Sequence, residues 1–369
     1  MQGKKIWAWS AAIGGALLAG AIAAVITGVV PFPLGPQRMG PPQNDMAIDQ
    51  AARNAVLANL VARLDEEYVF ADKAKEIGGF LLAQRQAGRY DAITSAEKFA
   101  ETLTEDLRQV SKDGHLAVHY SEKPIPEEQA REGKQADQIP PEMMADMVRL
   151  NFGFERIERL PFNIGYLEMR TFAPGPQAAA RIAAAMTLLQ DTSALIIDLR
   201  ANNGGSPDTV GVLAGHLFER RTRLNDIYTR KTDHTEERWS DDSVTPKYGE
   251  RKKVYILTSR DTFSAAEDFS YAMKNLKRAT IIGEATGGGA HPGEPRRLHA
   301  HFEAFLPTGR SISPITQGDW EGTGVLPDVQ VPADDALDEA QVRILRERLA
   351  SEQDASVKRR IERRIGELD

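Results

Sequence analysis

Residues 194–205 read ALIIDLRANNGG, an apolar run followed by a polar turn and a pair of glycines. The first six residues are apolar apart from Asp198, which is typical of a strand buried on both faces of a sheet. Gly204 and Gly205 could leave backbone N–H groups facing an oxyanion, although taken alone they are explained better by a tight turn. The stretch therefore predicts a central strand of an α/β sheet, with a candidate site at its carboxyl end.

The segments around this strand alternate between strand and helix patterns. Such alternation predicts an α/β domain whose sheet is covered by helices. The expected strands are Ile164–Met169, Val254–Thr258 and Thr280–Ile282, and the expected helices are Gln177–Gln190, 208–219 and about Ala265–Leu276.

The whole chain divides into five segments by composition and pattern. These are a signal peptide or membrane anchor (1–30), a Pro-rich linker (31–45), a helical N-terminal subdomain (46–122), the α/β domain (123–337) and a charged helical C-terminal segment (338–369). The last segment could pack on the core or mediate oligomers.

The N-terminal segment indicates export. Lys4 and Lys5 precede an uncharged, apolar run from residue 6 to 30, which is longer than the roughly 20 residues that a membrane span needs. Small residues at Ala21, Ala23 and Ala24 could instead form a signal-peptide cleavage site. Both alternatives predict a periplasmic or other extracytoplasmic location, with membrane attachment only if the segment stays uncleaved.

Composition excludes several classes of protein. Hydrophobic residues make up 41% and charged residues 27% of the 369 positions, as in an ordinary globular protein. The net charge of −7 argues against a nucleic-acid partner. The chain has no cysteine, which removes disulfides, thiolate nucleophiles and cysteine zinc sites. We expect no metal and no cofactor.

A second turn, TSRDTFSAAE at 258–267, contains the candidate nucleophile Ser264. Ser264 and Glu267 have capping-box spacing, so the serine could simply cap the following helix. A serine at a strand-to-helix turn also lies where the helix dipole stabilises negative charge, and the N–H of Ala265 could join an oxyanion hole. The pattern alone does not decide between these interpretations.

His115 lies in a third turn, SKDGHL at 111–116, which follows the last helix of the N-terminal subdomain. Most single histidines are structural, but histidine is the side chain best suited to take a serine proton near neutral pH. His291 is the main rival as base. The other candidates by composition are His119, His299 and His301.

Several runs taken together resemble the tail-specific (C-terminal-processing) protease family, closest to the branch that includes interphotoreceptor retinoid-binding protein. They occur in order over about residues 50–332. The resemblance implies a fold of ββα units related to the Clp protease and crotonase folds. The runs are ALIIDLRANNGG (194–205), TFSAAE (262–267), RATIIGEATGGG (278–289) and WEGTGVLPDV (320–329).

One departure from the family changes the implied mechanism. The better-known branch uses a serine–lysine dyad, and Gly289 occupies the position of that lysine. Relatives with the same loss, resembling the tricorn protease core, use a histidine base oriented by a glutamate. The matching residues are His115 and Glu321, which with Ser264 imply a triad. Gly204 or Gly205, with Ala265, would supply the oxyanion hole.

The resemblance implies a serine endopeptidase acting on polypeptides, namely unfolded or C-terminal segments of exported proteins. The alternative is a non-catalytic binder of apolar, retinoid-like ligands, because members of this branch use the same fold for transport. The presence of Ser264, His115 and Glu321 together favours the enzyme. A histidine base predicts activity that rises through roughly pH 6–7.

Overall fold

The computed structural model describes residues 43–127 and 141–369. The predicted signal or anchor segment and most of the Pro-rich linker lie outside these residues. Within the described ranges, no helix combines the length and the apolar composition that crossing a bilayer requires.

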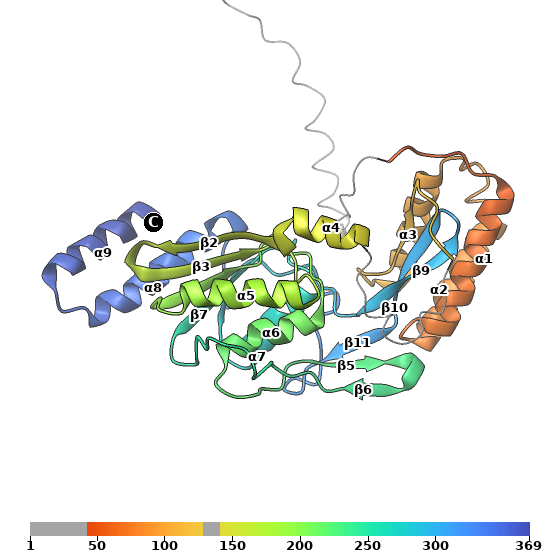
Figure 1. Cartoon of the computed structure of the whole chain (residues 1–369). Coiled ribbons are helices and arrows are strands. Elements are labelled where there is room, and N and C mark those ends of the chain that lie inside the picture. Colours follow the sequence, from red (N-terminus) through yellow and green to blue (C-terminus); the bar gives the residue numbers. More distant parts are fainter. Residues whose placement is uncertain (1–42, 128–140) are drawn as a thin grey trace, which may run out of the picture. The chain divides into compact units, whose positions relative to one another are not determined.

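The centre of the α/β domain is a six-stranded sheet with the order β12-β8-β7-β4-β3-β2 (Figure 1). β2 pairs antiparallel with β3, and the other neighbours in the sheet pair parallel. The strands are β2 (Phe154–Leu160), β3 (Ile164–Met169), β4 (Ala194–Asp198), β7 (Lys253–Thr258), β8 (Thr280–Gly283) and β12 (Val329–Gln330).

Helices cover both faces of this sheet, which explains the uninterrupted apolar run in β4. Leu195 and Ile197 face a core shared with α5, α6 and α7, while Ile196 faces the other side, where α8 packs (Figure 1). The helices are α5 (Pro176–Leu189), α6 (Pro207–Leu217), α7 (Ala265–Asn275) and α8 (Ala336–Ser351).

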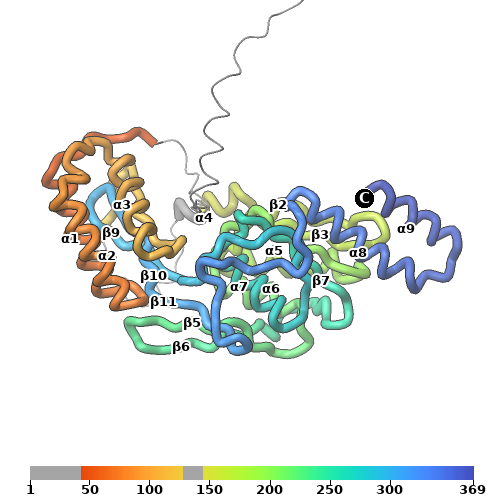
Figure 2. The backbone as a smooth tube through the Cα atoms, turned by 180° about the vertical axis from the view of Figure 1, so that it is seen from behind, coloured from red at the N-terminus to blue at the C-terminus, as the bar shows by residue number. Residues whose placement is uncertain are grey.

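A second core lies in the N-terminal subdomain, where three helices pack against a small antiparallel sheet of order β1-β10-β9 (Figure 2). Leu298, Phe302 and Leu306 come from the last third of the sequence and complete this core. The elements are α1 (Gln50–Glu67), α2 (Ala71–Gln86), α3 (Ala96–Ser111), β1 (Ala117–Tyr120), β9 (Gly293–His299) and β10 (Phe302–Pro307).

The remaining elements lie at the margins of these two cores. A third sheet has the order β11-β5-β6, and α9 packs against α8. These elements are α4 (Pro141–Arg149), β5 (Asp226–Thr229), β6 (His234–Glu236), β11 (Gly309–Ile312) and α9 (Ala355–Leu368).

The α/β class with a helical N-terminal region is therefore confirmed. Each strand and helix predicted for the α/β domain is present, with ends that agree to within about two residues. Of the histidines that were candidates by composition, His299 is the last residue of β9 and His301 lies in the turn before β10.

Candidate active site

The parallel pairing of β4 with β7 brings two of the predicted turns together. Both turns leave the carboxyl ends of neighbouring strands, so they meet at the same edge of the sheet. The Thr262 hydroxyl donates to the Leu199 carbonyl at 2.8 Å, and the Phe263 N–H donates to the Asn202 carbonyl at 2.9 Å. These bonds fix the polypeptide immediately before Ser264 against the glycine turn.

Ser264 is the N-cap of α7 and has an unusual backbone conformation, with φ 55° and ψ −120°. A non-glycine residue with positive φ stores strain, and such strain is concentrated at functional sites. The capping-box spacing is realised, because the Glu267 carboxylate accepts the Ser264 N–H at 2.8 Å. Capping and catalysis are therefore compatible here, since the bond to Glu267 uses the backbone of the serine.

Gly204 shows why this turn needs glycine. Its φ is +102°, and a Cβ atom at this position would lie only 2.6 Å from the Cβ of Ser264. Any side chain at 204 would push the serine away.

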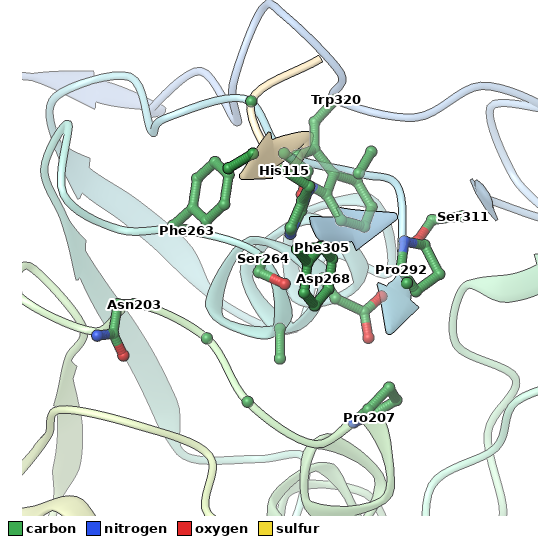
Figure 3. Close-up of a pocket in the computed structure, with 18 of the residues that line it drawn as sticks. His115, Asn203, Pro207, Phe263, Ser264, Asp268, Pro292, Phe305, Ser311 and Trp320 are labelled. Atoms are coloured by element: carbon green, nitrogen blue, oxygen red, sulfur yellow. The ribbon is translucent and has the colours of Figure 1, made fainter. Parts of the chain in front are cut away.

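Ser264 opens into a cavity of about 470 Å³. The wall includes His115, Gly204, Gly205 and Ala265, so five of the six residues predicted for the site line one cavity. Figure 3 shows the His115 ring above the Ser264 side chain, with a ring nitrogen directed towards the serine. His119 also lines the cavity, whereas His291 is not part of its wall.

The His115 ring is held by packing, and its nitrogens are unused. Its centroid lies 4.5 Å from that of Phe263 and 5.7 Å from that of Phe305. Both ring nitrogens are buried, and neither has a hydrogen-bond partner among the described residues. Burial lowers the pKa of His115 to about 4, although the nearby Asp113 carboxylate opposes this shift. The imidazole is thus neutral near pH 7, which is the state that a general base requires.

The backbone around His115 is fixed on both sides. The His115 N–H donates to Asp113 Oδ1 at 3.0 Å. The Arg108 guanidinium donates to the Gly114 carbonyl at 2.8 Å and to the Leu116 carbonyl at 3.2 Å. These bonds hold the turn, so the ring position follows from α3 and from the packing of the two phenylalanines.

The oxyanion-hole candidates differ in their hydrogen bonding. The Gly204 N–H donates to the Asn202 side chain at 2.9 Å and is therefore occupied. Within residues 43–127 and 141–369, the N–H groups of Gly205 and Ala265 have no acceptor. Of the two glycines that the sequence left open, Gly205 is thus the one whose N–H remains available to a ligand.

Glu321 lies beside His291 and not against the His115 ring nitrogens. Its Oε2 atom accepts the Ala290 N–H at 2.6 Å and lies 3.4 Å from His291 Nδ1. The Oε1 atom is buried and, among the described residues, unpartnered. Burial, together with the neighbouring Asp113 carboxylate, raises the pKa of Glu321 to about 8.

His291 belongs to a buried polar group behind the cavity. Its Nδ1 atom lies 2.8 Å from Asp113 Oδ2, which also accepts the Tyr68 hydroxyl at 3.0 Å. Burial lowers the pKa of His291, but the contact with Asp113 outweighs this and leaves the pKa raised. Asp113, His291 and Glu321 carry donor atoms within 4.8 Å of one another and could hold a metal ion. A metal would have to displace the existing His291–Asp113 hydrogen bond.

Two parts of the chain match models of one family. Residues 48–155 match the N-terminal domain of Peptidase_S41 in eukaryotic IRBP, and residues 163–331 match peptidase family S41. The chain belongs to peptidase family S41. The first matched segment contains the three helices of the N-terminal subdomain, the second contains most strands of the central sheet, and together they contain every residue predicted for the site.

Individual relatives of this S41 chain agree with the family. The chloroplastic C-terminal processing peptidase of Tetradesmus obliquus is 32% identical over 134 residues, which cover 34% of this chain and 26% of that protein. The tail-specific protease of Haemophilus influenzae is 30% identical over 116 residues, which cover 31% of this chain and 16% of that protein. The chain thus matches no more than about a quarter of either relative.

A solved structure supports the fold. A peptidase candidate from Parabacteroides merdae ATCC 43184 superposes with a TM-score of 0.54 at 19% identity. The alignment covers 82% of this chain and 99% of the other. The similarity therefore extends over the helical subdomain as well as the α/β domain.

Sequence reasoning missed other residues of the S41 site. Asp268 follows Ser264 by one helical turn and lines the same cavity, so the i, i+4 spacing could have identified it. Phe305 comes from β10, far from the other site residues in sequence, and no local pattern indicates its position. Arg108 lies on the last turn of a predicted helix, where a basic residue is expected for reasons unrelated to a site.

Proposed function

We propose that this chain is a serine-type endopeptidase in which Ser264 is the nucleophile and His115 the general base. The observation that carries the proposal is a strained serine at the N-terminus of α7, in the same cavity as a histidine whose ring nitrogens have no partner among the described residues. Besides a nucleophile and a base, the site needs a place for the oxyanion, and the N–H groups of Gly205 and Ala265 supply it. Nucleophile, base and oxyanion donors are what acyl transfer from a peptide needs.

The reaction follows from these positions. The Ser264 Oγ attacks the scissile carbonyl carbon while His115 takes the hydroxyl proton, and the carbonyl oxygen gains its negative charge between the two N–H groups. The positive end of the α7 dipole favours that charge. The tetrahedral intermediate then breaks the C–N bond, and His115 returns the proton to the leaving amine. A water molecule hydrolyses the acyl-enzyme by the same steps.

We assign to Glu321 the role of orienting His115 and, in its ionised form, stabilising the imidazolium. The Gly114 backbone lies beside the Glu321 carboxylate, which places that carboxylate next to the histidine turn. Glu321 Oε1 and both ring nitrogens of His115 are buried without partners among the described residues, so a rotation that joins them would satisfy two buried groups at once. Such hydrogen bonds are often formed only when substrate binds.

The substrates that we propose are unfolded or C-terminal segments of exported polypeptides. The apolar residues 6–30 support export to the periplasm or another extracytoplasmic space, with attachment to the inner membrane if they are not cleaved. The names of the two relatives, a C-terminal processing peptidase and a tail-specific protease, support the substrate class. A binder of apolar ligands is a poorer match, because the cavity wall carries Arg108, His115 and Asp268.

Labelling with a fluorophosphonate probe tests this function on the full chain. Wild-type protein should be labelled and should degrade a denatured protein, whereas Ser264→Ala should do neither. Ser243→Ala changes an exposed serine outside the cavity and should behave as wild type. If the probe labels Ser264→Ala as strongly as wild type, or if labelled wild type cleaves no polypeptide, the peptidase proposal is wrong.

A further inference from the structure

Asp268 lies one turn of α7 beyond Ser264 and lines the same cavity. Among the described residues of the cavity wall, it supplies the only carboxylate. Figure 3 shows this carboxylate beside Ser264. No step of the proposed hydrolysis uses Asp268, so its position next to the nucleophile needs another explanation.

In the part of the chain that the structure describes, the charge of Asp268 has no cationic partner. Its Oδ1 atom accepts the Asn225 amide at 2.7 Å, and the same amide also donates to the Asp268 carbonyl at 3.0 Å. No ion pair joins Asp268 to a cation among the described residues. Arg238 acts on it only through space, and its guanidinium is engaged by Asp208 and, at 2.8 Å, by Glu236.

A carboxylate removed from water without a counter-charge is costly, and burial raises the pKa of Asp268 to about 6. A cation that entered the cavity would supply the missing charge and a charge-assisted hydrogen bond. Arg108 also lines the cavity, but its guanidinium donates to two backbone carbonyls, and no ion pair joins it to Asp268 among the described residues. The cavity thus presents an uncompensated negative charge beside the nucleophile.

Resting on the peptidase function above, we propose that Asp268 selects substrates with a lysine or arginine side chain next to the scissile bond. The geometry suits a lysine or arginine side chain, because Ser264 and Asp268 are separated by about one helical turn, roughly 5–6 Å along the helix axis. The scissile carbonyl must lie at Ser264, so a four-carbon side chain from a flanking residue spans the distance to Asp268. Asp268 is therefore a specificity-determining residue and takes no part in bond cleavage.

The alternative is purely structural: Asp268 would serve only to hold Asn225. That role predicts an effect of Asp268→Asn on stability but none on the choice of substrate. The two roles are separated by comparing peptides that differ in charge at one position, since a structural defect lowers the cleavage of both peptides alike.

The experiment uses the full chain and internally quenched peptides with lysine or glutamine at each of the two positions that flank the scissile bond. We expect wild type to prefer lysine over glutamine at one of these positions by roughly 10- to 100-fold in kcat/KM, as a hydrogen bond between charged groups allows. Asp268→Asn should lower this ratio to about 1 and leave cleavage of the glutamine peptide within about threefold. Asp261→Asn, which changes an exposed carboxylate outside the cavity, should keep the preference.

Equal cleavage of both peptides by wild type would overturn the inference whatever the variants do, as would a preference that survives in Asp268→Asn. Should Asp268→Asn melt well below wild type, Asp268→Ser provides a second test without a charge. Fluorophosphonate labelling of Ser264 in the same samples separates the two proposals. Labelled protein that cleaves peptides without preferring lysine contradicts only the role of Asp268, whereas unlabelled, inactive protein contradicts the peptidase function itself.

Discussion

Gly289 packs directly against His115: a Cβ atom at position 289 would lie 2.7 Å from His115 Cε1, and closer still to the Phe263 ring. The family resemblance places the lysine of a serine–lysine dyad at this same position. A side chain at 289 and the histidine ring therefore compete for one space. The glycine is thus required for the histidine to lie beside Ser264.

Gly289→Ala tests this relationship. The added methyl group should displace the His115 ring and lower kcat/KM on the order of 10²-fold, because a shift of about 1 Å at a reacting group costs that much. Gly79→Ala is the matched control, since a Cβ atom there meets nothing within 4 Å. This control lies inside α2 and should raise the free energy of unfolding by about 0.5–1 kcal/mol with activity unchanged. Full activity of Gly289→Ala would show that the ring position does not matter.

The base itself is identified by combining variants. His115→Ala and Ser264→Ala should each lower kcat roughly 10³-fold or more, and the double variant should be barely worse than either, because the two residues act as one unit. Glu321→Gln should cost less, since Glu321 transfers no proton. His291→Ala should affect stability more than turnover, because His291 hydrogen-bonds Asp113 outside the cavity. Wild-type turnover in His115→Ala, with loss in His291→Ala, would assign the base to His291.

The fold was predictable where local pattern and burial agree. The run from Ala194 to Ile197 is apolar because both faces of β4 are covered, so composition alone identified this strand. The close approach of Ser264 to Gly204 was also predictable, because neighbouring parallel strands end at the same edge of the sheet. Local sequence patterns do not show which strands far apart in the chain pair with each other. Nothing local to Phe305 shows that β10 pairs with β1 and carries this ring to His115.

The site was predictable only in part, for a related reason. Motifs placed Ser264 and His115 in one site, but they could not say which hydrogen bonds are already made. Gly204 and Gly205 look alike in sequence, and only the fold shows that the Asn202 side chain occupies one of the two N–H groups. Likewise, the position of Glu321 against Ala290 depends on packing between loops that the sequence does not encode locally.

Glu267 holds the serine turn to the glycine run. Its buried carboxylate accepts the N–H groups of Ser264, Gly288 and Gly289 at 2.7–2.8 Å, and also the Thr286 hydroxyl. Glu267→Gln replaces one accepting oxygen by a donor, so at least one N–H loses its acceptor. We expect the free energy of unfolding to fall by about 1–3 kcal/mol.

Thermal denaturation measures this loss. The control is Glu66→Gln, which makes the same exchange at an exposed position on α1 and should leave the melting temperature unchanged. Activity of Glu267→Gln should fall as well, because both Ser264 and the glycine that faces His115 are released. A variant that melts like wild type would show that Glu267 is not needed to hold the turn.

The pH dependence of kcat/KM reports the ionisation of the base. Sequence reasoning predicted a rise through roughly pH 6–7, the range of a free imidazole. Burial lowers the pKa of His115 to about 4 in the structure, and the neutral form is the active one. The base therefore stays competent as the pH falls, and activity should be lost only as the pH approaches about 4. We expect the acid limb of the kcat/KM profile to lie well below pH 6.5. The measurement uses the glutamine peptide, because cleavage of an uncharged side chain should not depend on the ionisation of Asp268.

The Asp113→Asn variant tests independently whether the pKa of His115 is lowered. The Asp113 carboxylate opposes the effect of burial on His115, so removing its charge should move the acid limb to still lower pH. Circular dichroism at each pH confirms that the protein remains folded. A limb near pH 8 that disappears in Glu321→Gln would instead assign the rise to Glu321, whose pKa is raised to about 8. A limb that stays at pH 6–7 in both variants would mean that the catalytic imidazole is exposed to solvent, contrary to the buried nitrogens of His115.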